Sequence, residues 1–180
     1  MKPLIVLHLV ILIGSCQKLP PESAAPPHYP DIHQIYETQI RKLHGRSLIK
    51  KASLDSESEK RTFSMDSTEW KDELSFLAEI NPDQPEYTGV FDVEESNEVI
   101  RLKLKESENS ILKKLVITLS GDDYQSISAI LHEDKDVYTH HRELLILLDN
   151  GLISSFEMSG YRKMVFRDTV WFGIKGIVSE

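Results

Sequence analysis

The sequence predicts an α+β domain in which two N-terminal helices pack on an antiparallel meander of about seven strands. Three observations lead to this prediction. Apolar residues recur every three or four positions up to about residue 80, and they alternate with polar residues from about residue 87 onward. The alternating segments are separated by short turns, which favour antiparallel neighbours, and strong twist would curl such a sheet into a half-barrel.

The first helix is predicted over about residues 31–52. Asp31 follows a proline and can cap the helix by accepting hydrogen bonds from its first free N–H groups. Residues 41–51 hold five cations and no acid, which suits a helix C-terminus; a basic face for anionic headgroups or an acidic partner is the alternative. Polar residues 53–61 predict a loop. The apolar stripe consists of Ile32, Ile35, Tyr36, Ile40 and Leu43.

The second helix is predicted over about residues 67–80. Asp66 and Glu69 have the spacing of a capping box, in which each side chain binds the other residue's backbone N–H. Met65 and Trp70 stand where a hydrophobic staple would close over that cap. A proline at the end of the segment stops the helix.

Strands are predicted between residues 87 and 178. The clearest signal is the alternation of Ile100, Leu102 and Leu104 with cations, which is typical of a half-buried strand. Asp149-Asn150-Gly151 contains the Asn-Gly pair that tight hairpins favour. Further turns are predicted at Glu95–Asn97, Gly121–Asp123, Glu133–Asp136 and Arg167–Asp168.

Residues 1–15 have the parts of a secretory signal: a cation, an apolar run and small residues before a cut. At ~1.5 Å per helical residue, the run Leu4–Ile13 covers only about half of the ~30 Å hydrocarbon core, so it is too short to span a membrane. The motif Ile13-Gly14-Ser15-Cys16 resembles the lipobox of bacterial lipoproteins. An ordinary secretory signal with a chance cysteine is the alternative.

The lipobox resemblance implies that the chain is cut before Cys16, which then carries diacylglyceryl and acyl chains such as palmitate. Two or more such chains anchor a protein stably, whereas one chain binds a membrane only marginally. The resemblance also bears on location, because Asp after the cysteine often marks inner-membrane retention and this chain has Gln17. The bacterial outer membrane, facing the periplasm, is therefore favoured over the inner membrane.

The mature chain divides into a tether, residues 16–30, and a single domain, residues 31–180. The tether is rich in proline, which favours extended polyproline conformations. Cys16 is the only cysteine, so the chain can form no internal disulfide. The formal charge of −8 argues against a nucleic-acid partner, whose phosphates require a basic surface.

No residue pattern predicts a catalytic, metal or cofactor site. His132 precedes Glu133 and Asp134, but an acidic run between two strands is more simply a solvated turn. His140 and His141 are adjacent, so on a strand they would point to opposite faces. Residues 160–163, Gly-Tyr-Arg-Lys, fit a turn with basic neighbours better than an anion site. Nucleophile and phosphate-loop motifs are absent from the sequence, which weighs against an enzyme.

The sequence therefore predicts a non-catalytic, lipid-anchored envelope protein that binds an apolar or amphiphilic ligand or an envelope partner. The order of elements is similar to the half-barrel with helices across its mouth in periplasmic lipoprotein carriers and receptors. Two short helices cover only part of about seven strands, so an apolar groove is expected beside them. A structural or assembly lipoprotein of an outer-membrane complex and an envelope hydrolase are the alternatives.

Overall fold

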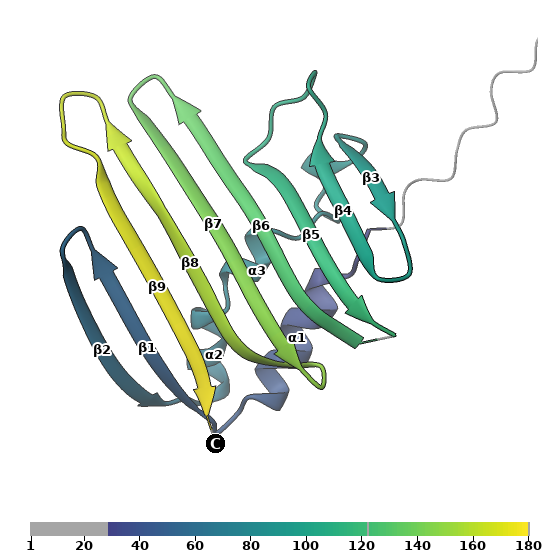
Figure 1. Ribbon diagram of the computed structural model, residues 1–180, viewed down its shortest axis with the longest axis vertical. Coiled ribbons are helices and arrows are strands. Elements are labelled where there is room, and N and C mark those ends of the chain that lie inside the picture. Colours follow the sequence, from purple (N-terminus) through teal and green to yellow (C-terminus); the bar gives the residue numbers. More distant parts are fainter. Residues whose placement is uncertain (1–28, 122, 180) are drawn as a thin grey trace, which may run out of the picture.

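The computed structural model describes residues 29–121 and 123–179, and the predicted signal, Cys16 and most of the tether lie outside this part of the chain. The described chain forms one open antiparallel sheet of nine strands, with short helices on one of its faces (Figure 1). The strand order is β2-β1-β9-β8-β7-β6-β5-β4-β3. The predicted antiparallel sheet with few helices is confirmed, whereas the strand count and the positions of the helices differ from the prediction, because a hairpin of two strands lies between the first helix and the second.

The chain alternates short helices and strands at first and then continues as strands alone. The helical elements are α1 (Ile32–Lys42), α2 (Ser67–Glu73), α3 (Phe76–Glu79) and the 3-10 turn η1 (Pro85–Tyr87). The strands are β1 (Ser47–Leu54), β2 (Glu57–Ser64), β3 (Phe91–Glu95), β4 (Val99–Leu104), β5 (Leu112–Ser120), β6 (Asp123–Lys135), β7 (Tyr138–Asp149), β8 (Leu152–Met164) and β9 (Val170–Ser179).

The first helix is much shorter than predicted. The Asp31 cap is confirmed, because its carboxylate accepts a hydrogen bond from the Gln34 N–H at 2.8 Å. The helix stops at Lys42 instead of continuing to residue 52, because Gly45 takes a left-handed backbone, φ 79°, that a helix cannot contain. The predicted cationic C-terminus thus shrinks to Arg41 and Lys42.

The predicted second helix is present as two pieces. The capping box is confirmed: the Asp66 side chain accepts from the Glu69 N–H, and the Glu69 carboxylate accepts from the Asp66 N–H. The helix ends at Glu73, and α3 begins at Phe76 after two intervening residues, so residues 67–80 do not form one continuous helix. Tyr87, predicted to begin the first strand, lies in η1 instead.

The hairpin of β1 and β2 corrects the prediction most strongly. It occupies residues predicted as helix end and loop, and it adds two strands to the seven strands β3–β9 that follow residue 87. β1 pairs with β9, so the N-terminal hairpin extends the C-terminal side of the meander (Figure 1). The two edge strands, β2 and β3, each pair with only one neighbouring strand among the described residues, so the sheet is open.

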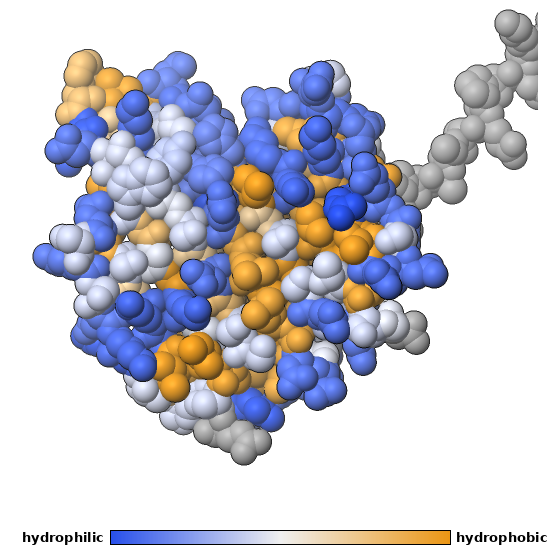
Figure 2. Space-filling view, in the orientation of Figure 1, coloured by the Kyte–Doolittle hydropathy of each residue, from blue (hydrophilic) through white to orange (hydrophobic). Residues whose placement is uncertain are grey.

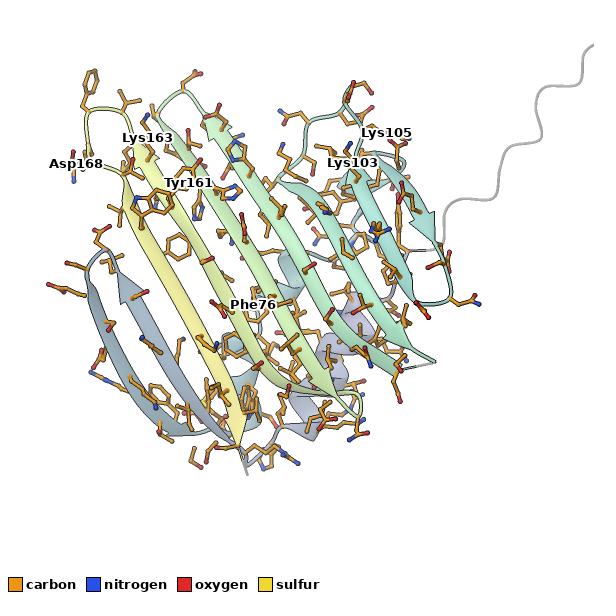
Figure 3. The ribbon with its side chains drawn as sticks, in the orientation of Figure 1. Phe76, Lys103, Lys105, Tyr161, Lys163 and Asp168 are labelled. Carbon is orange, nitrogen blue, oxygen red and sulfur yellow. The ribbon has the colours of Figure 1, made fainter. Side chains whose placement is uncertain are left out.

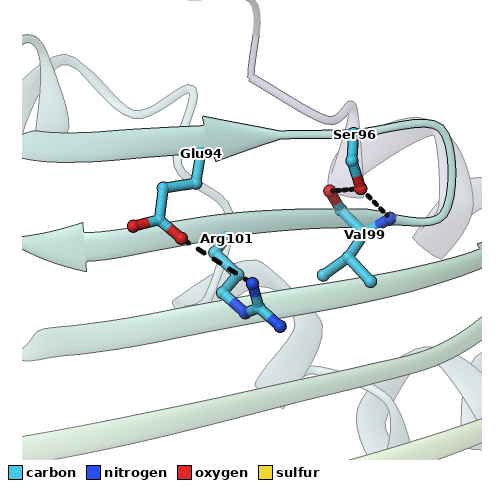
Figure 4. A network of polar contacts seen from close by, with 4 residues as sticks. All are labelled: Glu94, Ser96, Val99 and Arg101. Carbon is cyan, nitrogen blue, oxygen red and sulfur yellow. Dashed lines mark hydrogen bonds and ion pairs between the residues drawn. The ribbon is translucent and has the colours of Figure 1, made fainter.

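The meander follows the predicted order of strands and turns, but its strands are longer, and Glu133–Lys135, predicted as part of a turn, form the end of β6. Asn150 and Gly151 both have positive φ, 51° and 71°, as the predicted tight hairpin requires. Residues 160–163 lie within β8 and are not a turn, because the strand continues through them in register with β7 and β9. The edge hairpin β3–β4 is closed by Ser96, whose hydroxyl accepts from the Val99 N–H, and by a Glu94–Arg101 ion pair (Figure 4).

The core lies between the helices and one face of the sheet. Trp70, Leu74 and Leu77 are fully buried there, and the Phe76 ring on α3 lies 5.3 Å from the Phe156 ring on β8. Gly176 makes room for that ring, because a Cβ at this position would lie 2.3 Å from the Phe156 Cζ. The core cluster of the described residues begins at Tyr29, so a chain that starts at residue 17 retains all of these residues.

Candidate functional site

The helices leave part of their own side of the sheet uncovered, where β2, β1 and β9 lie side by side. We call this face of the sheet the helix side and the opposite face the open face. The register places Ala52 between Glu59 on β2 and Ile174 on β9, and Leu54 between Glu57 and Phe172. Side chains in one such row point to the same face, so these rows line the helix side together.

These rows form an elongated hollow, which we call the groove. It consists of two adjoining hollows of about 540 Å³ and about 240 Å³ that share Ala52 and Glu59. Leu54 is 56% exposed, although most leucines in the described part of the chain are buried. The apolar lining of the groove is made by Ala52, Leu54, Phe63, Phe172 and Ile174.

Charged side chains stand along the rim of the groove. Lys50 donates to the Glu73 carboxylate on α2 at 2.8 Å, and both side chains are half-buried, so this pair joins β1 to the helix layer. Arg61 donates from Nε to Glu59 at 2.6 Å along the exposed edge strand. The fifth charged residue of the rim, Glu57, lies beside Leu54. The groove thus has an apolar floor and polar margins of both signs.

A histidine lies beyond the Phe172 end of the groove. The His140 ring centroid is 5.8 Å from that of Phe172. Burial lowers the pKa of His140, and the neighbouring guanidinium groups of Arg142 and Arg162 lower this pKa further. The imidazole is therefore neutral at pH 7 and adds an uncharged aromatic surface beside the groove.

The open face carries a second, shallower hollow of about 450 Å³ across β5 to β8. Figure 2 shows this face, with apolar side chains toward its middle and polar ones around them. Leu145, Leu147 and Ile177 are each more than 40% exposed there. The side chains around the hollow are of mixed character and include Lys114, Ser128, Ile130, Glu143, Leu145, Glu157 and Ser159.

The histidines are arranged as their positions on strands predict. The His141 ring stacks on the Tyr161 ring with centroids 5.4 Å apart (Tyr161 is labelled in Figure 3). Its neighbour His140 contacts Phe172 on the other face of the sheet, which confirms that the two histidines point to opposite faces. His132 lies opposite His141 with ring centroids 5.7 Å apart. Within residues 29–121 and 123–179, no three His, Cys, Asp or Glu side chains come together where they could hold a metal ion.

The residues that line the groove were missed by the sequence prediction. Only Phe172 and Ile174 fall in a predicted strand, because residues 47–52 were interpreted as the end of the first helix and residues 53–61 as a loop. The local signal at this hairpin was the turn-forming pair Asp55-Ser56, whereas Ile49 and Lys50 interrupt the alternation of apolar and polar residues along β1. The predicted lipidation site, Cys16, lies outside the described residues.

No family model matches the chain, and neither the curated proteins nor the solved structures include a match. Among the residues that the structure describes, no helix has the length and hydropathy needed to cross a membrane.

Proposed function

We propose that this protein is a non-catalytic envelope lipoprotein, held to a membrane by lipid on Cys16, that binds the apolar chain of an amphiphile in the groove. The observation that carries the proposal is the groove itself. Its apolar floor of Ala52, Leu54, Phe172 and Ile174 remains partly open to solvent beside an otherwise packed core. Sites for small ligands are typically concave and mostly apolar, with a few polar groups at the margin.

The size and charge of the groove fit an amphiphile. Hollows of about 540 Å³ and about 240 Å³ together lie in the range of small-molecule sites, roughly 300–1,000 Å³. An acyl chain laid along β1 and β9 would bury apolar surface on both molecules, at roughly 25 cal/mol per Å². The headgroup would then lie among the rim charges, where Lys50 and Arg61 can donate to an anionic or zwitterionic group.

The test is a titration of the soluble chain, residues 17–180, with a fluorescent fatty acid. We expect saturable binding at micromolar probe, without chemical change of the probe. Ala52→Phe fills the groove and should weaken binding at least tenfold. The matched control is Lys51→Phe, which adds the same ring one residue away on the opposite face and should leave binding unchanged, because successive strand residues point to opposite faces.

Two results would count against the groove. Equal losses of affinity in Ala52→Phe and Lys51→Phe would mean that the probe binds at another site or non-specifically. Absence of saturable binding, with native mass spectrometry of the protein purified from its envelope showing no associated lipid, would remove the amphiphile from the proposal.

The open face supports a second candidate, the docking of an envelope protein. Leu145, Leu147 and Ile177 stay exposed between charged and hydroxyl side chains, a mixture that ordinary protein interfaces share. A photo-crosslinker at position 145 should then give one discrete adduct in cells, and Leu147→Asp should abolish it. A crosslinker at exposed Ala78 on α3 is the control. Equal adduct patterns at positions 145 and 78 would argue against this candidate.

A further inference from the structure

Two neighbouring hairpin turns at one end of the sheet expose large apolar side chains. Val137 lies in the turn between β6 and β7. Met164 ends β8, and Val165 and Phe166 begin the turn between β8 and β9. We call these four residues the tip patch. The Val165 N–H donates to the Val137 carbonyl at 3.1 Å, so the two turns lie against each other. The patch is at the top left of Figure 2, above Lys163 and Asp168 in Figure 3.

Phe166 is the most unusual residue of the tip patch. Its side chain is fully exposed, so it packs on nothing in the described chain. Its backbone has a φ of 65°, a left-handed conformation that bulky residues rarely adopt and that glycine or asparagine would adopt more easily. The fold therefore gains nothing from this phenylalanine, and a stored local strain of this kind points to a role outside the fold.

Charged residues flank the tip patch on both sides. Lys163 precedes it and Arg167 follows it, and neither forms an ion pair with another described residue, while Asp168 and Asp136 offset their charge. Long cationic side chains at the border of an apolar patch can extend to lipid phosphates while their stems stay in apolar surroundings. The turns at the opposite end of the sheet, such as Ser96–Glu98 and Asn150–Gly151, carry no large apolar side chain.

We propose that the tip patch inserts into the interfacial region of a lipid bilayer. A protruding turn fits a fluid interface better than it fits a flat protein surface, because lipids rearrange around Phe166 and Val165 at little cost. Fully exposed aromatic and aliphatic side chains beside cations are also the chemistry of interfacial membrane segments. The contact would add a second membrane attachment to the lipid predicted on Cys16.

The tip patch is continuous with the groove. Val170, Phe172 and Ile174 alternate along β9, so they share the helix side and form an apolar row that runs from the hairpin turn into the groove. A tip held in the headgroup layer would place the open end of that row next to membrane lipids. This inference goes beyond the proposed ligand, since insertion of the tip requires nothing to occupy the groove.

The test places a fluorescent reporter on the tip. The soluble chain, residues 17–180, lacks cysteine, so Phe166→Cys gives a single site for an environment-sensitive dye. With vesicles of phosphatidylethanolamine and phosphatidylglycerol we expect a blue shift and quenching by lipids spin-labelled near the headgroup. Asn97→Cys, in the exposed β3–β4 turn at the other end of the sheet, is the control and should show neither effect.

A second measurement separates insertion from damage to the fold. Phe166→Asn should weaken sedimentation with vesicles about tenfold, from the apolar surface removed, while thermal stability stays equal or rises because asparagine tolerates the left-handed backbone. Ile177→Ser, which removes an exposed apolar side chain from the open face, should leave sedimentation unchanged. A dye at position 166 that stays in water with vesicles would overturn the proposal. So would a blue shift without vesicles that grows with protein concentration, because it would show that a second copy covers the tip.

Discussion

Gln39 joins the first helix to a hairpin more than a hundred residues away, and its replacement tests the packing of the fold. It is the one buried polar residue among those described, 2% exposed. Its side-chain amide donates to the Gly151 carbonyl at 2.9 Å, and its amide oxygen accepts from the Ile153 N–H at 2.8 Å. Both partners are backbone groups of the β7–β8 hairpin, so one side chain satisfies two groups at the helix–sheet boundary.

Gln39→Leu keeps the size of the side chain and removes both hydrogen bonds. Each bond contributes about 0.5–1.5 kcal/mol net, and the buried Ile153 N–H left unpaired costs about 1–3 kcal/mol. We expect the free energy of unfolding to fall by about 2–4 kcal/mol, measured by urea denaturation of residues 17–180 followed by circular dichroism. A loss below about 0.5 kcal/mol would refute this account of the helix–sheet boundary.

Gln39→Glu adds a pH test of the same contact. A buried carboxylate would face the Gly151 carbonyl without a proton to donate, so its folded pKa should lie above the unfolded value of about 4.3. A raised folded pKa means that stability is fully present at low pH and is lost as pH rises through that pKa. The variant should therefore be less stable than wild type at pH 7 and recover on acidification. Gln34→Glu, exposed on the same helix, should not show this recovery.

Three further predictions concern the core, the groove end and the anchor. Trp70→Ala should lower the free energy of unfolding by about 3–5 kcal/mol, because the side chain is fully buried. Trp70→Phe should lower it by clearly less, because the buried Trp70 Nε1 has no hydrogen-bond partner among the described residues, and equal losses for the two variants would contradict this expectation. The lowered pKa of His140 means that the unfolded chain binds the proton more tightly, so the folded state loses stability as pH falls below about 6.5. In His140→Gln the urea midpoint should therefore depend less on pH in this range than in the wild type. An unchanged pH dependence would exclude His140 as the cause. Labelled palmitate should enter the wild-type protein and not Cys16→Ala, whereas equal labelling would exclude Cys16 as the lipid site.

Local signals were sufficient wherever neighbours in the sequence are also neighbours in space. The Asp66–Glu69 capping box and the Asn150–Gly151 turn are formed by residues within three positions of one another, and both were predicted. The seven strands β3–β9 pair successively, so alternation and turn residues were enough to place them. The strand ends were misplaced because they are polar, as at residues 133–135, and so show no alternation of apolar and polar side chains.

The hairpin β1–β2 could not be placed in this way, and the candidate groove was missed with it. Every residue of β2 is exposed, so this strand carries no burial pattern for a sequence to reveal. β1 is ordered by pairing with β9, more than a hundred residues away, and a partner at that distance leaves no trace in local periodicity.

The sequence by itself determined the helix caps, the meander from β3 to β9 and the expectation of a lipid on Cys16, because capping, alternation and a lipobox are read from adjacent residues. Only the tertiary structure decided which apolar residues stay exposed. Phe172 on β9 and Leu54 on β1 are large apolar residues of the kind that fill cores, yet they line the groove because the helices end before reaching them. Burial depends on what the rest of the chain places above a residue, and that is a property of the whole fold.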